Sequence, residues 1–379
     1  MEITEQTLYA ALSKVIDPDL KKDIVELDLV QDVTVDGNSI TIIVEVTNPA
    51  MHSRKRMEEA VKFQVKQAFG EGVSVHVSTR PVSGNRGGLR KVLPFVKHVI
   101  AVASGKGGVG KSTVTANLAA GLAARGLKVG LVDADIYGPS MPLMFDVVKE
   151  RPRVKQLDGK NVIVPVESYG VQMLSIGFFA DPGQAIAWRG PMASKALDQL
   201  FKDADWGELD VMLVDMPPGT GDIHLQLVQA VPLSGAVIVS TPQPVALIDA
   251  RKGVALFQMD ALNVPVLGIV ENMSWFATDE ALKGRRLMDI PESERHYIFG
   301  KHGAKALAEE LKVPYMAEIP LVQSIREAAD VGRPAILQGD TPAAQAYVPL
   351  LDSMERILAG LGEQGPKKTA DPAHEMIVK

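Results

Sequence analysis

The first 80 residues carry two apolar helical patterns and three short strand patterns. Helical spacing runs over 8–16 and 57–69. The strand patterns are 33–35, 40–46 and 73–77. Asp36-Gly37 is a hairpin signal between the first two strands, with Asn38-Ser39 available to lengthen the loop. The order α-β-β-α-β predicts a small α+β domain over residues 1–80.

Residues 81–91 differ in composition from what surrounds them. They hold three Gly, one Pro and three basic residues, without an acidic one. Such a composition is typical of a flexible tether. We therefore predict a linker over 81–97.

From residue 98 onward, short apolar runs alternate with helical patterns. The apolar runs are 98–104, 128–133, 210–215, 235–240 and 266–270. The helical patterns are 113–125, 192–202, 244–260 and 303–312. Near-continuous apolar runs are typical of strands buried on both faces of a parallel sheet. The alternation predicts an α/β fold with a doubly wound, mostly parallel sheet over 98–362, then a polar tail over 363–379.

The amino-acid composition excludes several classes of protein. The chain has 379 residues, 46% of them hydrophobic and 23% charged, as in soluble globular proteins. A net charge of -6 and 5% aromatic residues argue against nucleic-acid binding. We see neither a signal peptide nor an apolar run that would span a bilayer, so we expect a cytoplasmic protein that does not bind membranes. Without cysteine, the chain itself supplies no disulfide, thiolate ligand or thiol nucleophile.

The strongest motif is a glycine-rich loop after the first of these strands. Residues Gly105-Lys106-Gly107-Gly108-Val109-Gly110-Lys111-Ser112-Thr113 satisfy G-x-x-x-x-G-K-S/T between a strand and a helix, which is the context of a P-loop. Glycines let the backbone N–H groups turn inward, and the helix adds its positive end. We expect the loop to bind ATP, with Lys111 on the β- and γ-phosphates and Ser112 on Mg²⁺.

Three acidic residues end neighbouring apolar runs. Asp133 and Asp135 follow one run, and Asp215 closes another. Asp215 has the Walker B placement, so we expect it at Mg²⁺, with Asp133 in the outer shell of the metal. Asp135 is then the residue expected to position the attacking water.

Two further residues lie at strand ends where a nucleotide would bind. Gly219 lies in the Pro-Pro-Gly segment behind Asp215 and is expected to approach the γ-phosphate through its N–H. Asn272 ends another apolar run. Its amide matches the donor and acceptor edges of adenine, although an Asn that caps a turn is an alternative.

These strand-end sequences together resemble the Mrp/ApbC family. They are Ala103–Thr113, Asp133–Ser140, Asp215–Asp222 and Glu271–Ser274. The resemblance covers residues 92–350 and implies a P-loop ATPase that assembles iron–sulfur clusters or carries them to apo-proteins. The small domain is similar to the metal–sulfur-cluster assembly domain often fused ahead of this ATPase. That similarity lies in Asp17–Asp19, Leu27–Val30 and Val46–Met51.

Lys106 acquires a role through this resemblance. The string Lys-Gly-Gly-x-Gly-Lys-Ser/Thr is the deviant P-loop of the dimeric ATPases of the MinD and ParA types. The resemblance implies that ATP closes a homodimer and that Lys106 reaches the partner's nucleotide, acting like an arginine finger. Lys106, Lys111 and Asp135 would then carry a slow, Mg²⁺-dependent hydrolysis.

Two positions depart from the family pattern. Many members have Cys-x-x-Cys after Glu-Asn-Met-Ser, where this chain has 275–280 without a thiol, and Met51 with His52 stands where the small domain usually has Cys. An iron–sulfur cluster, with scaffold or apo-client proteins as partners, is thus implied by the resemblance, while the usual ligands are absent. The spacing of His52, His296 and His302 favours surface histidines over ligands.

Two other functions stay open on the sequence alone. One is a positioning ATPase of the MinD or ParA kind, which would want a membrane-binding amphipathic helix or a basic face. The other is an ATP-gated adaptor that displays residues 1–80 to partners without a cluster of its own.

Overall fold

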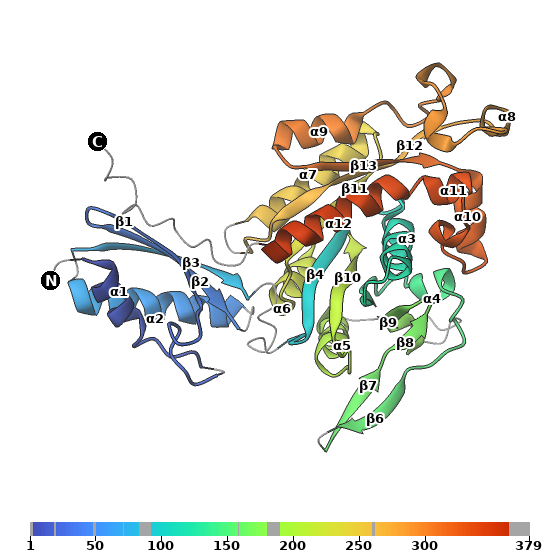
Figure 1. Cartoon of the computed structure of the whole chain (residues 1–379). Coiled ribbons are helices and arrows are strands. Elements are labelled where there is room, and N and C mark those ends of the chain that lie inside the picture. The colour runs from blue at the N-terminus through green and yellow to red at the C-terminus, as the bar shows by residue number, and fades with distance from the viewer. Residues whose placement is uncertain are drawn as a thin grey trace, which may run out of the picture.

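A computed structural model of the chain describes residues 3–18, 20–47, 51–70, 72–82, 92–157, 159–179, 190–259 and 262–363. Figure 1 shows a small N-terminal domain beside a larger domain built on a long sheet. The fold class predicted from the sequence is confirmed: a doubly wound α/β domain follows a small α+β domain. Among the described helices, none combines the length and apolar character needed to cross a bilayer.

The small domain has the predicted order of elements. They are α1 (Glu5–Leu12), β1 (Val30–Asp36), β2 (Ser39–Val46), α2 (Met51–Phe69) and β3 (Ser74–Pro81). The sheet order is β1-β2-β3, with an antiparallel first pair and a parallel second pair. The hairpin turn is Gly37-Asn38 rather than the predicted Asp36-Gly37, because Asp36 pairs with Ser39. Gly37 takes the left-handed conformation, with a φ of 57°.

The large domain is built on a sheet of eight strands among the described residues. From one edge to the other they are β13 (Tyr315–Leu321), β12 (Val266–Phe276), β11 (Gly235–Ser240), β4 (Val96–Ser104), β10 (Leu209–Pro218), β5 (Val129–Asp133), β9 (Val171–Ser175) and β8 (Val166–Ser168). Every neighbouring pair is parallel except β8 with β9. The five apolar runs of the sequence form the five strands from β12 to β5. A separate hairpin is formed by β6 (Arg153–Leu157) and β7 (Lys160–Val164).

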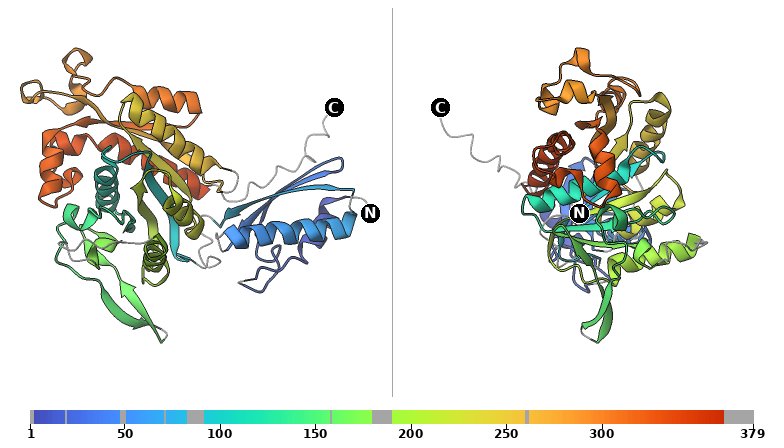
Figure 2. Two further views of the ribbon diagram at one scale, coloured as in Figure 1. Left: turned by 180° about the vertical axis from the view of Figure 1, so that it is seen from behind. Right: turned by 90° about the vertical axis from the view of Figure 1, so that its right-hand side faces the viewer.

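Helices cover both faces of this sheet (Figures 1 and 2). One face packs against α3 (Lys111–Ala124), α4 (Met141–Met144), α10 (Gln323–Asp330), α11 (Pro342–Gln345) and α12 (Val348–Glu363). The other packs against α5 (Gly190–Lys202), α6 (Asp222–Ala230), α7 (Pro244–Gln258) and α9 (Gly303–Leu311). Strand β10 shows the alternation: Val211 and Leu213 enter the first core, and Met212 and Val214 the second.

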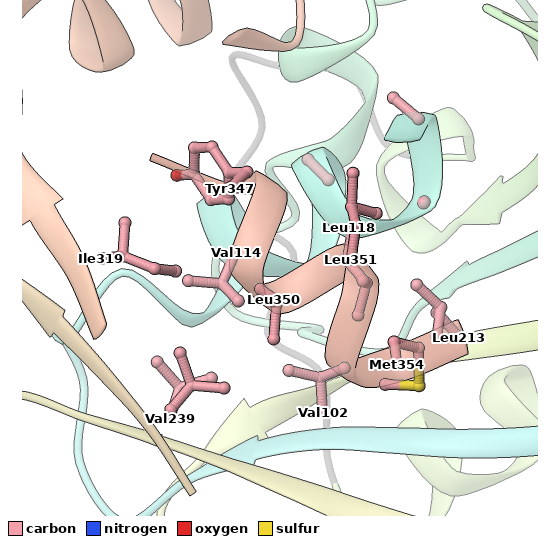
Figure 3. Close-up of a cluster of buried hydrophobic side chains, with 14 of the residues drawn as sticks. Val102, Val114, Leu118, Leu213, Val239, Ile319, Tyr347, Leu350, Leu351 and Met354 are labelled. Atoms are coloured by element: carbon pink, nitrogen blue, oxygen red, sulfur yellow. The ribbon is translucent and has the colours of Figure 1, made fainter. Parts of the chain in front are cut away.

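Helix α12 fixes α3, the helix that follows the glycine-rich loop (Figure 3). Leu350, Leu351 and Met354 are buried in the same core as residues of α3 and of the sheet. Leu351 lies directly over Gly121 of α3, where a Cβ would fall only 2.6 Å from Leu351 Cδ1. The sequence did not predict α12, although it carries part of the core under the loop.

The predicted linker is too long at its C-terminal end. Val92, Leu93 and Val96 are buried in a core of the large domain, so that domain begins before residue 98. Residues 83–91 of the linker, and 364–379 of the predicted tail, lie outside the described residues. Arg54 of α2 donates from Nη1 to the carbonyl of Leu262 at 2.9 Å, which joins the two domains.

Candidate functional site

The glycine-rich loop connects β4 to α3, as the motif requires. Gly108 and Gly110 both have a φ of 82°, a conformation that favours glycine. Helix α3 begins at Lys111, directly after the loop. Backbone N–H groups in this arrangement, together with the positive end of the helix, form an anion site. The loop therefore has the backbone geometry for phosphate binding.

Two glycines of the loop are required by close contacts. A Cβ at Gly105 would lie 2.1 Å from main-chain atoms of Asp249 in α7, and one at Gly110 would lie 2.2 Å from Asn272 Nδ2. Asn272 is 7% exposed and donates from Nδ2 to the carbonyl of Val109 at 2.8 Å. Asn272 thus holds the loop in place, and its predicted contact with adenine stays a prediction.

A buried ionic cluster lies at the beginning of α3. Lys111 Nζ is 2.8 Å from Asp215 Oδ2, and the two side chains are only 6% and 0% exposed. Ser112 donates its hydroxyl to the same oxygen at 2.7 Å. Thr115 Oγ1 is 2.8 Å from Asp215 Oδ1 and 2.9 Å from the carbonyl of Lys111, so its single proton serves either acceptor. The fold thus brings together Lys111, the hydroxyl of Ser112 and the Walker B carboxylate of Asp215, as predicted from the sequence.

This donor set fits a Mg²⁺–nucleotide complex. Ser112 and Asp215 offer the hard oxygen atoms that Mg²⁺ prefers, at the beginning of an anion-binding helix. Lys111 supplies a cation beside them. Thr115 was missing from the sequence prediction. The available signal was a hydroxyl one helical turn after Lys111, on the same face of the helix.

Asp133 has a different environment from the one predicted. It is fully buried, and its Oδ1 accepts from the N–H of Asp135 at 3.2 Å. Its Oδ2 accepts from Met141 N at 3.1 Å and from Ser175 Oγ at 2.9 Å. Burial, with the nearby charge of Asp215, raises the pKa of Asp133 to about 7. Both oxygens thus hold the loop after β5, and the predicted outer-shell role at Mg²⁺ stays a prediction.

Asp135 and Gly219 lie on the two loops that the sequence singled out. Asp135 is half-buried, and its Oδ1 accepts from Gly138 N at 3.2 Å. The N–H of Gly219 donates to Ser104 O at 3.0 Å, which ties this loop to the end of β4. A bond from this N–H to a γ-phosphate would first require that contact to open.

His224 is a buried residue near the site that the sequence analysis did not identify. It lies on α6, is 3% exposed, and has Nε2 2.7 Å from the carbonyl of Pro217. A carbonyl only accepts, so Nε2 carries the proton. Burial lowers the pKa of His224, and the charge of Lys111 lowers it further, so the ring is neutral at pH 7.

Lys106 lies at the start of the loop with its side chain half exposed. Ser104 donates its hydroxyl to the backbone carbonyl of Lys106 at 3.0 Å. Within the residues that the structure describes, no ion pair engages the Lys106 ammonium. The lysine is therefore fixed through its backbone, while its cation is available to a ligand.

The positions that departed from the family pattern differ in what the structure describes. The side chains of Met51 and His52 lie outside the described residues. Phe276 ends β12, and α8 (Asp279–Leu282) follows it. His302 is half-buried, with its Nδ1 buried and without a hydrogen-bond partner among the described residues, and the preference for surface histidines over ligands stays a prediction.

Two family profiles match this chain. The profile described as NUBPL iron-transfer P-loop NTPase matches residues 95–355, which include the whole candidate site. The profile described as iron–sulfur cluster assembly protein matches residues 5–77, the small domain.

Relatives and solved structures agree with these profiles. The iron–sulfur cluster carrier protein of Synechocystis is 40% identical over 346 residues, covering 91% of this chain and 95% of the relative. The protein of the same name from Deinococcus radiodurans is 42% identical over 362 residues, covering 93% and 94%. The nucleotide-binding protein of Archaeoglobus fulgidus in complex with ADP is 36% identical with a TM-score of 0.54, covering 65% of this chain and 91% of that one.

Proposed function

The chain belongs to the family of NUBPL-type iron-transfer P-loop NTPases, and we propose that it is a slow, Mg²⁺-dependent ATPase that transfers iron–sulfur clusters to apo-proteins. One observation carries the ATPase part: Lys111, Ser112 and Asp215 form a buried cluster where the P-loop enters α3. Relatives that align over nearly the whole chain are named iron–sulfur cluster carrier proteins, and this supports an iron–sulfur cluster as the cargo.

Binding of ATP would redistribute the contacts among the buried side chains of Lys111, Ser112 and Asp215. The loop N–H groups hold the phosphates, and Lys111 turns from Asp215 to the β- and γ-phosphates. Ser112 and Asp215 would then hold Mg²⁺, which would neutralise charge on the phosphate oxygens when bound. Asp215 keeps the hydrogen bond from Thr115, so its second oxygen stays oriented.

We assign the hydrolytic step to Asp135. Asp135 orients a water, whose oxygen attacks the γ-phosphorus while the bond to the β–γ bridging oxygen breaks. ADP keeps the electron pair of that bond, phosphate leaves with the new oxygen and one proton of the water, and the other proton passes to solvent. Chemistry is coupled to movement of the two loops, because Gly219 N–H must release Ser104 O before it reaches a phosphate.

The Lys106→Ala protein is expected to bind ATP normally and to hydrolyse it about 100-fold more slowly, as when one donor to transition-state charge is removed. Nucleotide titration and steady-state phosphate release measure the two effects. Lys128→Ala is a matched control, because Lys128 is an exposed lysine just before β5, at the opposite ends of the strands. Turnover of Lys106→Ala at the wild-type rate would exclude the proposed role.

Mixing two impaired variants tests whether Lys106 acts across a homodimer. In a mixed dimer of Lys106→Ala and Lys111→Ala, the site with an intact Lys111 faces a subunit with an intact Lys106. We therefore expect the mixture to show ATPase activity well above that of either variant alone. If activity is not recovered on mixing, Lys106 acts within its own subunit.

The Asp135→Asn protein is expected to bind ATP, to hydrolyse it slowly and to accumulate as an ATP-bound dimer. Asparagine keeps an oxygen for the N–H of Gly138 while it removes the charge that orients the water. Light scattering after size exclusion, with and without ATP, measures the dimer. A monomeric variant with normal turnover would assign water positioning to another residue.

Cluster transfer is tested separately from ATP hydrolysis. The chain contains no cysteine, so we propose that thiolates of the scaffold or client protein hold the cluster during transfer. Iron and sulfide bound to the chain and to an apo-acceptor with a four-cysteine site are quantified after anaerobic reconstitution, with and without ATP. We expect the wild type with ATP to accelerate loading of the acceptor. Equal loading with Lys111→Ala would contradict the coupling to ATP.

A further inference from the structure

Three potential metal ligands meet on the large domain away from the P-loop. Glu271, His302 and Glu318 each bring one ligand atom within 4.8 Å of the others. They come from β12, from the residue before α9 and from β13, which lie at the same edge of the sheet in Figure 1. Asn272 faces the P-loop, so its neighbour Glu271 lies on the opposite face of β12. The cluster is thus distinct from the nucleotide site.

Two of these ligand atoms are buried without a hydrogen-bond partner among the described residues. Glu271 is 0% exposed, and its Oε2 accepts from the N–H of Ala304 at 2.6 Å. That bond and a second one from the N–H of Lys305 cap the beginning of α9. Glu271 Oε1 and His302 Nδ1 are buried and have no hydrogen-bond partner within the part of the chain that the structure describes. Buried polar atoms of this kind are costly unless something binds them.

The charges of the cluster favour a cation. Glu271 and Glu318 are direct neighbours in the register of β12 and β13, and like charges in this arrangement repel. Arg295 Nη1 and Trp275 Nε1 each lie 3.3 Å from Glu318 Oε1, so Glu318 is partly balanced from one side. Glu271 Oε1 is not balanced in this way, because it has no hydrogen-bond partner among the described residues.

His302 is held in a conformation that costs backbone energy. Its φ is 55°, in the left-handed region that non-glycine residues rarely adopt. Its ring packs edge-on against Tyr297, with the centroids 5.8 Å apart. Backbone and ring packing together fix the imidazole beside the two carboxylates.

We propose that Glu271, His302 and Glu318 bind a divalent transition-metal cation of the Zn²⁺ class. An imidazole nitrogen with two carboxylates suits such a cation, whereas Mg²⁺ prefers a shell of oxygen atoms alone. Ligand bonds of about 2.0–2.2 Å require the three atoms to move slightly closer together than 4.8 Å. The inference does not depend on the proposed ATPase or on cluster transfer.

The test uses Zn²⁺ and the full-length, untagged chain without nucleotide. After chelator treatment, Zn²⁺ binding is measured by calorimetry and by metal content after dialysis, with Mg²⁺ in large excess. His302→Asn is the main variant, because asparagine tolerates the left-handed backbone conformation. Glu271→Gln is the second, because glutamine retains an oxygen for the N–H of Ala304. His296→Asn is the matched control, since His296 lies nearby at the end of β12 but outside the cluster.

We expect one Zn²⁺ per chain that Mg²⁺ does not displace. His302→Asn and Glu271→Gln are each expected to weaken Zn²⁺ binding by more than about 100-fold, since loss of a ligand exceeds the effect of losing its supporting contacts. His296→Asn is expected to bind like the wild type. Added Zn²⁺ is also expected to raise the melting temperature of the wild type but not of His302→Asn. Equal Zn²⁺ affinity in the wild type and His302→Asn would overturn the proposal, as would an equal loss in His296→Asn.

Discussion

The Lys111→Ala protein is expected to lose ATP binding almost completely. Lys111 is expected to make charge-assisted bonds to two phosphates, and each such bond contributes about 1.5–3 kcal/mol. Loss of both corresponds to an affinity about 10²–10⁴-fold weaker. Titration with a fluorescent ATP analogue measures this change directly. ATP affinity within a factor of about three of the wild type would contradict the assignment of the P-loop lysine.

The same substitution is expected to reduce folding stability. Removal of Lys111 leaves the buried carboxylate of Asp215 without its cation, and breaking such a buried pair costs about 3–5 kcal/mol. Lys97→Ala is the matched control. Lys97 of β4 pairs at 2.6 Å with Asp210 of β10, the strand that also carries Asp215, but the Lys97 side chain is 51% exposed. An exposed pair contributes only about 0–1 kcal/mol, so denaturant unfolding should separate the two variants clearly.

A double variant distinguishes the two effects of Lys111. In Lys111→Met with Asp215→Asn, neither charge is left unpaired, so much of the lost stability is expected to return. ATP binding is expected to stay weak, because no cation faces the phosphates. Recovery of both properties in the double variant would mean that Lys111 only stabilises the fold.

Gly105→Ala is expected to disrupt both the fold around the loop and nucleotide binding. The added methyl would lie 2.1 Å from main-chain atoms of Asp249. Moving the backbone of β4 or of α7 to relieve this clash would cost packing energy. We expect a loss of about 3 kcal/mol or more in unfolding free energy, at the upper end of overpacking effects. Denaturant unfolding and ATP titration measure the two consequences.

Gly107→Ala is the matched control for stability in this experiment. Gly107 lies two residues along the same loop, and the nearest atom to its added Cβ is 3.9 Å away, an ordinary contact distance. Its expected change in unfolding free energy is within about 0.5 kcal/mol. Equal stability of the two alanine variants would show that α7 moves freely under the loop.

The sequence predicted those parts of the site that lie in one continuous motif. Residues 105–113 carry the loop, its glycines and its lysine together, and spacing alone identifies them. Asp215 was predictable because it directly ends an apolar strand. By contrast, the partners of Gly219 and Asn272 are carbonyl groups of the loop region, which only the folded chain brings into contact.

The parts that the sequence did not predict depend on tertiary pairing. Strand β13 was not predicted, because Glu318 and Pro320 interrupt its apolar pattern. The position of Glu318 beside Glu271 follows only from the pairing of β13 with β12. His302 lacks ligand-like spacing in sequence, and its backbone conformation and burial come from the start of α9.

The packing of α12 on α3 also bears on how the protein is made. Translation completes the P-loop and α3 early, whereas Leu350, Leu351 and Met354 emerge much later. Until then, the apolar side of α3 is not packed against α12, and the nascent chain exposes a hydrophobic surface of the kind that chaperones recognise. The first domain faces no such delay, because its core closes with Val82. Ribosomes that stall before residue 350 would therefore release a product with a folded small domain and an incompletely folded large domain.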